Sequence, residues 1–290
     1  MDLLLIAAVI ILYSFQTLFC KLFTDKYPGR AELASPVFGV LEGLFIALFT
    51  FAFNGFQFTA SPFTIIMGVL NAAMLFGYNT SLIAASKKGS YAFMNVILLF
   101  GGILIPSVYS WTCLSEEITA LKIIGILAML VALVLMNLSE MKMEKSPLIY
   151  YVFCFILFIF NGAYSTIVKV QTVYHDDEKQ EMIMLTFLIM SFVALFELIA
   201  KEKKNTLKAF KLNVKSIIPL AVCLISAGSA INLLVFIIPF VDTAVLYTIE
   251  SGGVLVLSAL YSVILFKEKL SPSKFIGIIL AVASITVLSI

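Results

Sequence analysis

The sequence predicts an all-α integral membrane protein with ten transmembrane helices arranged as two inverted five-helix repeats. Three observations support this fold class: the composition, the length of the apolar runs, and an internal repeat. Of the 290 residues, 62% are hydrophobic and 12% are charged, and the mean hydropathy is +1.10. Soluble domains have about 45–50% apolar and about 25% charged residues. The composition therefore excludes a soluble globular domain.

Ten apolar runs, separated by polar, proline or glycine residues, are each long enough to cross a bilayer, which takes about 20 residues at 1.5 Å per residue. The first run, LLLIAAVIILYSFQTLF, follows no basic stretch and precedes no small-residue cleavage site, so we interpret it as a span and not as a signal peptide. The polar connections are too short to form a soluble domain. The predicted spans are 3–23, 33–54, 63–86, 90–113, 118–138, 148–172, 180–200, 214–239, 241–266 and 271–290.

The second half of the chain repeats the first. Residues 109–130 align without a gap with residues 261–282. The residues that then correspond are Tyr109 and Tyr261, Ser110 and Ser262, Glu116 and Glu268, Lys122 and Lys274, and Gly125 and Gly277. We expect one transport unit made of repeats 1–140 and 147–290. Because each repeat has an odd number of spans, the repeats enter the membrane in opposite orientations, as in secondary transporters.

The ten-span pattern, LFKEKLS at the end of the ninth span and GIILAVASITVL in the tenth resemble the drug/metabolite transporter superfamily, in its EamA-like branch. The resemblance covers the whole chain and is strongest over 241–290. It is weaker over 1–60, where the family's usual arginine in the second helix is absent, as is the basic connection after that helix. The resemblance implies a solute carrier and leaves the solute open. It also implies that the first, third, fourth, sixth, eighth and ninth helices line the solute cavity.

Two acidic residues lie deep within predicted spans, where a charge costs at least about 2.5–3.5 kcal/mol. Glu250 lies near the middle of the ninth span, before Gly252 and Gly253, and Glu42 lies near the middle of the second. Glycines let another backbone approach closely. We therefore expect Glu250 to face a wet cavity, where its carboxylate binds an ammonium group or carries a proton. The alternative is a structural glutamate hydrogen-bonded between helices, and Glu42 is open to the same two interpretations.

Lys21 and Lys169 occupy corresponding positions near the ends of the first and sixth spans. One interpretation is that both side chains extend to the membrane interface. The other is that they are gating residues, each paired with an acid in one access state, with Glu116 or Glu268 as the natural partner.

Polar side chains at similar depth are further candidates for binding solute. In the family, they would lie on cavity-lining helices, and their chemistry suits a small zwitterionic or hydroxylated solute, such as an amino acid. Each alone is more often a hydrogen bond between helices than a ligand contact. With Glu250, the substrate-binding candidates are Gln16, Thr17, Asn71, Tyr78, Asn95, Asn161, Ser165, Ser226, Asn232, Tyr247 and Ser251.

Other function classes find little support in the sequence. GxxxxGK[ST], HExxH and GxSxG are absent, the one histidine, His175, lies in a connection, and the four cysteines form no CxxC pair. We expect no enzyme, no cofactor, no metal and no nucleic-acid partner. The expected function is export or exchange of a small metabolite by alternating access, with proton coupling through Glu250 as a hypothesis. The alternatives are an exporter of cationic drugs and a translocase of a lipid-linked sugar.

Assembly and orientation are left open. We expect a monomer or a homodimer in a plasma or inner membrane. Most of the nineteen Lys and Arg residues lie at odd-numbered connections or the helix ends beside them, which by the positive-inside rule puts both termini outside. The family resemblance puts them inside. Small residues at 125, 128 and 132 and at 277, 281 and 284 form ridges that we expect to serve packing or dimer contacts.

Overall fold

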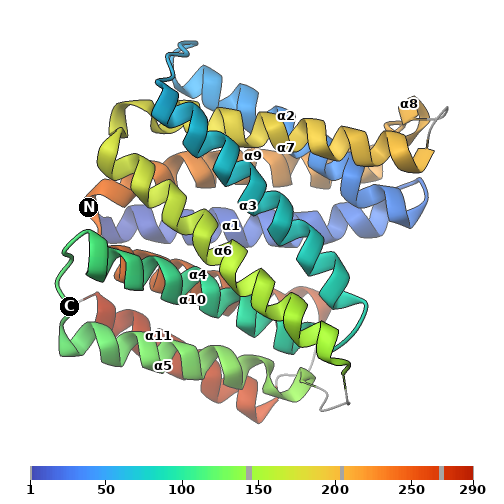
Figure 1. The fold of residues 1–290 in the computed structure, drawn as a ribbon. Coiled ribbons are helices and arrows are strands. Elements are labelled where there is room, and N and C mark those ends of the chain that lie inside the picture. The colour runs from blue at the N-terminus through green and yellow to red at the C-terminus, as the bar shows by residue number, and fades with distance from the viewer. Residues whose placement is uncertain (1, 142–145, 203–205, 268–270, 290) are drawn as a thin grey trace. The chain divides into compact units, whose positions relative to one another are not determined.

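A computed structural model describes residues 2–141, 146–202, 206–267 and 271–289, and in these ranges all regular elements are helices (Figure 1). Short 3₁₀ turns lie at Leu138–Glu140, Asp176–Glu178 and Ile238–Phe240. The α-helices are α1 (Asp2–Lys26), α2 (Ala31–Phe53), α3 (Pro62–Ser86), α4 (Tyr91–Cys113), α5 (Ala120–Asn137), α6 (Leu148–Tyr174), α7 (Lys179–Glu202), α8 (Thr206–Ala209), α9 (Val214–Ile237), α10 (Thr243–Phe266) and α11 (Pro272–Leu288).

A long helix lies at each of the ten predicted spans. Nine helices of the described residues are long and apolar enough to cross a membrane, and α11 is a shorter apolar helix of 17 residues. The chain is therefore an all-helical, multi-pass membrane protein. One polar connection also contains the short helix α8.

Two helix ends near residue 240 differ from the prediction for identifiable reasons. α9 ends at Ile237 instead of 239, because Pro239 has no N–H and its ring clashes with the preceding turn of a helix. α10 begins at Thr243 instead of 241, because the Asp242 carboxylate accepts hydrogen bonds from Ala244 N (3.1 Å) and Val245 N (3.3 Å) and so caps the helix.

The chain forms two compact units. Unit 1 comprises residues 1–10, 73–170 and 237–290, and unit 2 comprises residues 11–72 and 171–236. Helices α1, α3 and α6 each have residues in both units. This division follows contacts in space, and the predicted relation between repeats 1–140 and 147–290 stays a prediction.

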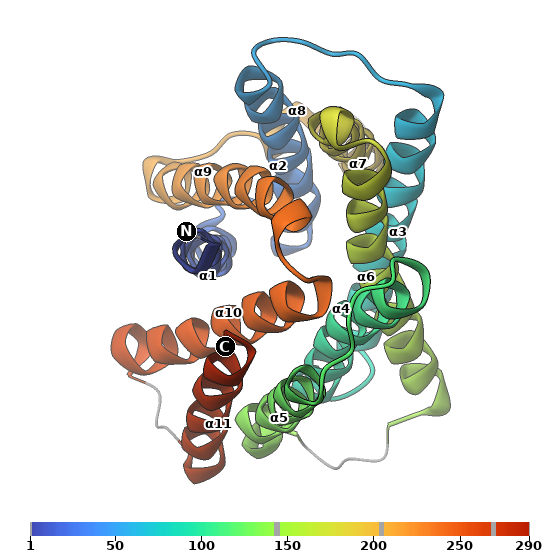
Figure 2. The ribbon, with the colours of Figure 1, turned by 90° about the vertical axis from the view of Figure 1, so that its left-hand side faces the viewer.

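In unit 1, α5 and α11 lie side by side (Figures 1 and 2) and pack through the two ridges of small residues. Ser284 Oγ donates to the Gly125 carbonyl at 2.6 Å. A Cβ added at Gly277 would lie 2.8 Å from Met136 N and 2.9 Å from the Ala132 carbonyl, so the backbones approach too closely for a larger residue. The ridges therefore pack against each other within the chain. This is one of the two roles predicted for them, the other being dimer contacts.

The opposite faces of α5 and α11 carry exposed aliphatic and aromatic side chains. In a chain of membrane-spanning helices such faces are suited to lipid. The exposed residues are Ile123, Ile124, Leu127 and Val131 on α5, and Phe275, Ile276, Ile279 and Val282 on α11.

In unit 2, α2 packs against α7 through a second glycine ridge. A Cβ added at Gly43 would lie 2.6 Å from the Phe187 carbonyl and 2.8 Å from Ser191 Cβ. Ser191 Oγ in turn donates to the Val40 carbonyl at 3.0 Å. The glycine beside Glu42 therefore lets α2 and α7 pack closely.

Replacing Ala281 with leucine should destabilise the fold, because Ala281 is fully buried on the ridge that α11 presents to α5. Overpacking of this kind costs about 1–3 kcal/mol. The matched control is Ala283→Leu, which makes the same change at an exposed position of the same helix. Thermal unfolding in detergent should show a lower melting temperature for Ala281→Leu alone. Equal melting temperatures for the two variants would contradict the packing argument.

Candidate functional site

A polar face runs along α6 in unit 1. Asn161, Ser165 and Lys169 are spaced four residues apart and therefore lie above one another on one side of the helix. Asn161 Nδ2 donates to the Leu98 carbonyl of α4 at 2.9 Å. The Ser165 carbonyl accepts from the Tyr247 hydroxyl of α10 at 3.0 Å. We call these residues, with the groups that bind Lys169, the polar seam.

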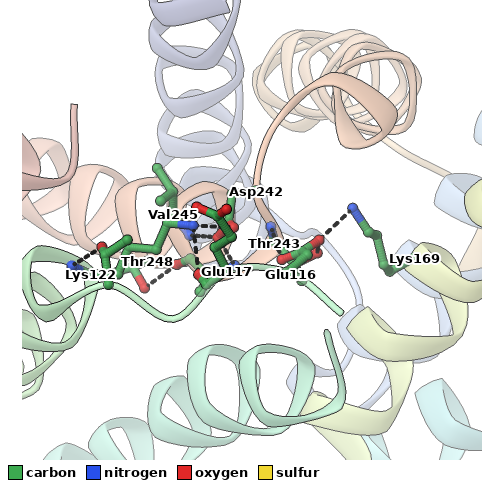
Figure 3. A network of polar contacts seen from close by, with 10 residues as sticks. Glu116, Glu117, Lys122, Lys169, Asp242, Thr243, Val245 and Thr248 are labelled. Carbon is green, nitrogen blue, oxygen red and sulfur yellow. Dashed lines mark hydrogen bonds and ion pairs between the residues drawn. The ribbon is translucent and has the colours of Figure 1, made fainter. Parts of the chain in front are cut away.

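Lys169 makes the charged end of the polar seam. Its Nζ lies 3.1 Å from Glu116 Oε1 and 3.2 Å from the Ile238 carbonyl, and the Lys169 side chain is only 7% exposed. Glu116 Oε2 accepts from Thr243 N at 3.0 Å, and Oε1 accepts from Thr243 Oγ1 at 2.7 Å (Figure 3). The pairing of Lys169 with Glu116 that the sequence suggested is thus present, and the Lys169 side chain is buried instead of extending to an interface.

A second ion pair links the first turn of α5 to the residue before α10. Lys122 Nζ lies 2.6 Å from Asp242 Oδ2 and donates to the Glu117 carbonyl at 2.9 Å (Figure 3). Sequence reasoning did not single out Asp242 or Thr243. Their signal was an Asp-Thr pair directly before an apolar run, which is typical of a helix N-cap. Their partners could not be found that way, because Glu116 and Lys122 lie in a different part of the sequence.

Glu250 lies on α10 about two turns beyond Thr243, and Tyr247 lies between them. Its carboxylate is partly buried and accepts a hydrogen bond from Ser251 Oγ at 3.3 Å. Within the described ranges no lysine, arginine or histidine pairs with it. The carboxylate is therefore held by its own helix neighbour and, among the described residues, by no ion pair.

The glycines after Glu250 allow two other helices to come close to α10. A Cβ at Gly252 would overlap the Met129 side chain of α5. A Cβ at Gly253 would lie 2.6 Å from Ile10 Cδ1 of α1. The sequence predicted that another backbone approaches these glycines, whereas the nearest atoms belong to side chains of α5 and α1.

Two further candidates of unit 1 are partly buried on other helices. Tyr78 of α3 packs against the apolar cluster that includes Met94 and Leu157. Asn95 lies on α4 and is partly buried.

In unit 2, Glu42 has one amide partner. Gln16 Nε2 of α1 donates to Glu42 Oε1 of α2 at 2.9 Å, and the Gln16 carbonyl accepts from Cys223 Sγ of α9 at 3.3 Å. Thr17 is exposed and donates to the Tyr13 carbonyl of its own helix. Lys21 is exposed, in contrast to the buried Lys169. Gln16 thus joins three helices around an acid that the sequence had singled out.

The remaining candidates of unit 2 are buried between helices. Asn71 Nδ2 donates to Thr186 Oγ1 at 3.3 Å, and Asn232 Nδ2 donates to Thr50 Oγ1 at 2.8 Å. Ser226 is 4% exposed. The two asparagines act as ties between helices here, which was the alternative given for every residue of this kind.

The candidate residues of the two units offer carboxylate, amide, hydroxyl and ammonium groups. In the described ranges no three His, Cys, Asp or Glu side chains are grouped so that they could hold a metal ion. The polar seam offers amide and hydroxyl groups and a lysine paired with Glu116, and Glu250 of α10 adds a carboxylate. Such an arrangement suits a small polar or charged molecule, and its ion pairs can be exchanged for others without covalent chemistry.

The Lys169–Glu116 pair should show strong energetic coupling. Lys169→Met leaves a largely buried carboxylate without its cation, which costs about 3 kcal/mol in comparable buried pairs. The double variant Lys169→Met/Glu116→Gln should therefore lose much less stability than the two single variants combined. Free energies of unfolding in mixed micelles measure this. The control cycle is Lys201–Glu197, a pair in which both side chains are about 40% exposed and whose coupling should be under about 1 kcal/mol. Equal coupling in both cycles would contradict a buried pair.

Comparisons with known proteins support the fold and do not name a function. No protein-family model matches the chain, and no curated protein matches its sequence. Among solved structures, 29 chains match. One, described only as "Crystal structure of protein", has a TM-score of 0.79 and 16% sequence identity, over 99% of this chain and 94% of that chain. At this identity the likeness establishes a shared fold alone.

Proposed function

We propose that this protein is a secondary transporter that moves a small polar organic metabolite across the membrane by alternating access. The observation that carries the proposal is the polar seam. Ionisable side chains within apolar spans are energetically costly, and they are found mainly where they serve a pathway or a site. Its residues come from α6 and α10, and its charged end includes the connection before α5. Together with the ten-helix fold and the terminal LFKEKLS pattern, this supports membership of the drug/metabolite transporter superfamily, in its EamA-like branch.

Reciprocal contacts between α5 and α11 support an inverted repeat. Tyr109 and Tyr261 are 152 residues apart. The same offset relates Gly125 to Gly277, and Met136 to Leu288. A Cβ at Gly125 would lie 2.6 Å from Leu288 Cδ2, and a Cβ at Gly277 would lie 2.6 Å from Met136 Cγ. The glycine of each helix therefore packs against the equivalent residue of the other helix. A two-fold axis between the repeats produces this pattern.

A second reciprocal pair involves four other helices of unit 1. The 152-residue offset relates Gly101 of α4 to Gly253 of α10, and the 148-residue offset between Lys21 and Lys169 relates Ile10 of α1 to Phe158 of α6. Gly101 packs closely on the Phe158 backbone, and Gly253 packs on the Ile10 side chain. In each repeat, a glycine of the fourth helix thus packs against the first helix of the other repeat. Inverted repeats of this kind give carriers two forms of similar energy, open to opposite sides.

We assign a gating role to Lys169 and Glu116. The pair is largely buried and links α6 to the start of α10, so its opening would release two cavity-lining helices from each other. The symmetry-related partner of Lys21 would be Glu268, which lies outside the described residues. The access state in which Lys21 is paired therefore stays a prediction.

We assign solute binding to Glu250 together with part of the polar seam. The carboxylate would bind an ammonium group, while Asn161, Ser165, Tyr247 and Ser251 supply hydrogen bonds to a zwitterionic or hydroxylated solute. Proton coupling would follow if protonated Glu250 crosses without solute. Within the described ranges, no lysine or arginine pairs with Glu250. An exporter of cationic drugs would also need such an unpaired carboxylate, so that function is the second candidate.

A thermal-shift panel on the purified chain in detergent tests the proposal. It should contain amino acids, polyamines, quaternary cations, sugars, nucleosides and organic phosphates. A ligand at 100 times its dissociation constant stabilises the native state by about 2.7 kcal/mol. Stabilisation by amino acids supports the metabolite carrier, and stabilisation by quaternary cations alone supports the drug exporter. The absence of any stabilising ligand would contradict both and leave the translocase of a lipid-linked sugar.

Replacing Glu250 with glutamine should abolish binding of an ammonium-bearing ligand, because the neutral amide gives no charge attraction. In the parent protein the same binding should weaken as the pH falls, since protonation neutralises the carboxylate. Transport in proteoliposomes at several pH values measures both effects. The matched control is Glu197→Gln, the same change at a residue that is partly exposed and paired with Lys201. Unchanged transport and unchanged pH dependence in Glu250→Gln would exclude its role in binding and coupling.

A further inference from the structure

The connection between α7 and α9 presents a group of basic side chains that the proposed transport cycle does not use. Lys208, Lys211 and Lys215 are all exposed, and none has an ion-pair partner among the described residues. Each of two exposed apolar side chains directly precedes one of these lysines in the sequence: Leu207 is 86% exposed and Val214 is 71% exposed. We call these five residues the basic-apolar patch.

Three acids at the same end of unit 2 pair with other bases. Arg30 pairs with Glu32 at 3.3 Å and also with Glu202. Lys201 pairs with Glu197 at 2.6 Å. None of these three acids pairs with a lysine of the patch, so the three lysines add positive charge to the outer side of the segment.

The patch belongs to a segment that is fixed on its other side. The Tyr27 hydroxyl donates to the Ala209 carbonyl at 2.8 Å. Burial, with the nearby Glu202 charge adding to it, raises the pKa of Tyr27, so this hydroxyl stays a protonated donor. Ala209 is 7% exposed, and Phe210 and Leu212 pack against the apolar cluster that includes Phe23.

The start of α9 fixes the far end of the segment. Asn213 Oδ1 accepts from Ser216 N at 2.9 Å, and Ser216 Oγ accepts from Asn213 N at 3.2 Å, which is a reciprocal N-terminal cap. The segment therefore has an inner side held by the protein and an outer side made of lysine and apolar side chains. Little conformational freedom is lost when a partner binds such a surface.

The chemistry of the outer side fits one partner. Lysines beside a membrane-spanning helix bind anionic headgroups, and exposed apolar side chains enter the region between headgroups and acyl chains. We propose that the basic-apolar patch is a docking surface for anionic phospholipids, with the three lysines on the headgroups and Leu207 and Val214 in the interface. Because anionic lipids are concentrated in the cytoplasmic leaflet, this surface places the α7–α9 connection on the cytoplasmic side.

Lipid binding to the delipidated full chain in neutral detergent tests the proposal. The probes are phosphatidylglycerol and phosphatidylcholine, each with a fluorescent acyl chain, at low and high salt. The parent should bind phosphatidylglycerol more tightly, with a preference that weakens as salt rises. Lys208→Gln/Lys211→Gln/Lys215→Gln should reduce the affinity for phosphatidylglycerol by about five-fold for each lysine removed. Lys203 and Lys204, outside the described residues, stay unchanged in all variants.

The matched control removes three exposed lysines elsewhere, in Lys87→Gln/Lys88→Gln/Lys267→Gln. It should keep the preference for phosphatidylglycerol, as should the charge-preserving Lys208→Arg/Lys211→Arg/Lys215→Arg. Leu207→Ser should weaken binding of the lipid and leave its salt dependence unchanged. The proposal is overturned if the patch variant keeps the preference, or if the control variant loses it to the same extent. Equal elution volume and helical content of all variants separate these outcomes from misfolding.

Discussion

The constraint on which this fold depends is that a polar group between apolar helices needs a partner within the chain. Lys169 meets it through Glu116 and the Ile238 carbonyl, and Glu116 completes its own hydrogen bonds with Thr243. Removing any one member would leave a group that cannot be solvated by hydrocarbon. The positions of α6, the start of α10 and the connection before α5 are therefore linked by polar satisfaction as well as by apolar packing.

Apolar packing in the same molecule works by a different rule. Between helices in lipid there is no hydrophobic force to draw them together, so close contact requires small residues. Gly277 and Ser284 on α11 supply it against α5, and Gly43 supplies it on α2 against α7. The glycine contacts make rigid helix pairs, whereas the polar seam joins helices through bonds that can be exchanged. A carrier needs both, because some helix pairs must move as bodies while other contacts open.

The sequence predicts the helices well because their signal is local. Twenty apolar residues in a row have one stable form in a bilayer, and small-residue spacing reveals which face packs closely. The pairing of Lys169 with Glu116 was one of the alternatives that the sequence left open, beside a lysine extending to the interface and a pairing with Glu268. Partners were missed where the choice depends on tertiary geometry. The sequence position of Gln16 does not show that its amide binds Glu42. Likewise, the position of Asp242 does not show that its carboxylate both caps α10 and pairs with Lys122.

The two acids within the spans differ in a way that separates their roles. Glu42 receives a hydrogen bond from Gln16 of another helix, and Gln16 is itself engaged by Cys223. Among the residues that the structure describes, Glu250 receives one only from the adjacent Ser251. A carboxylate held by neighbouring helices resists displacement and favours a structural or coupling role. A carboxylate held by its own helix can exchange its partner for a solute without breaking a contact between helices, and for this reason Glu250 is the stronger candidate for binding.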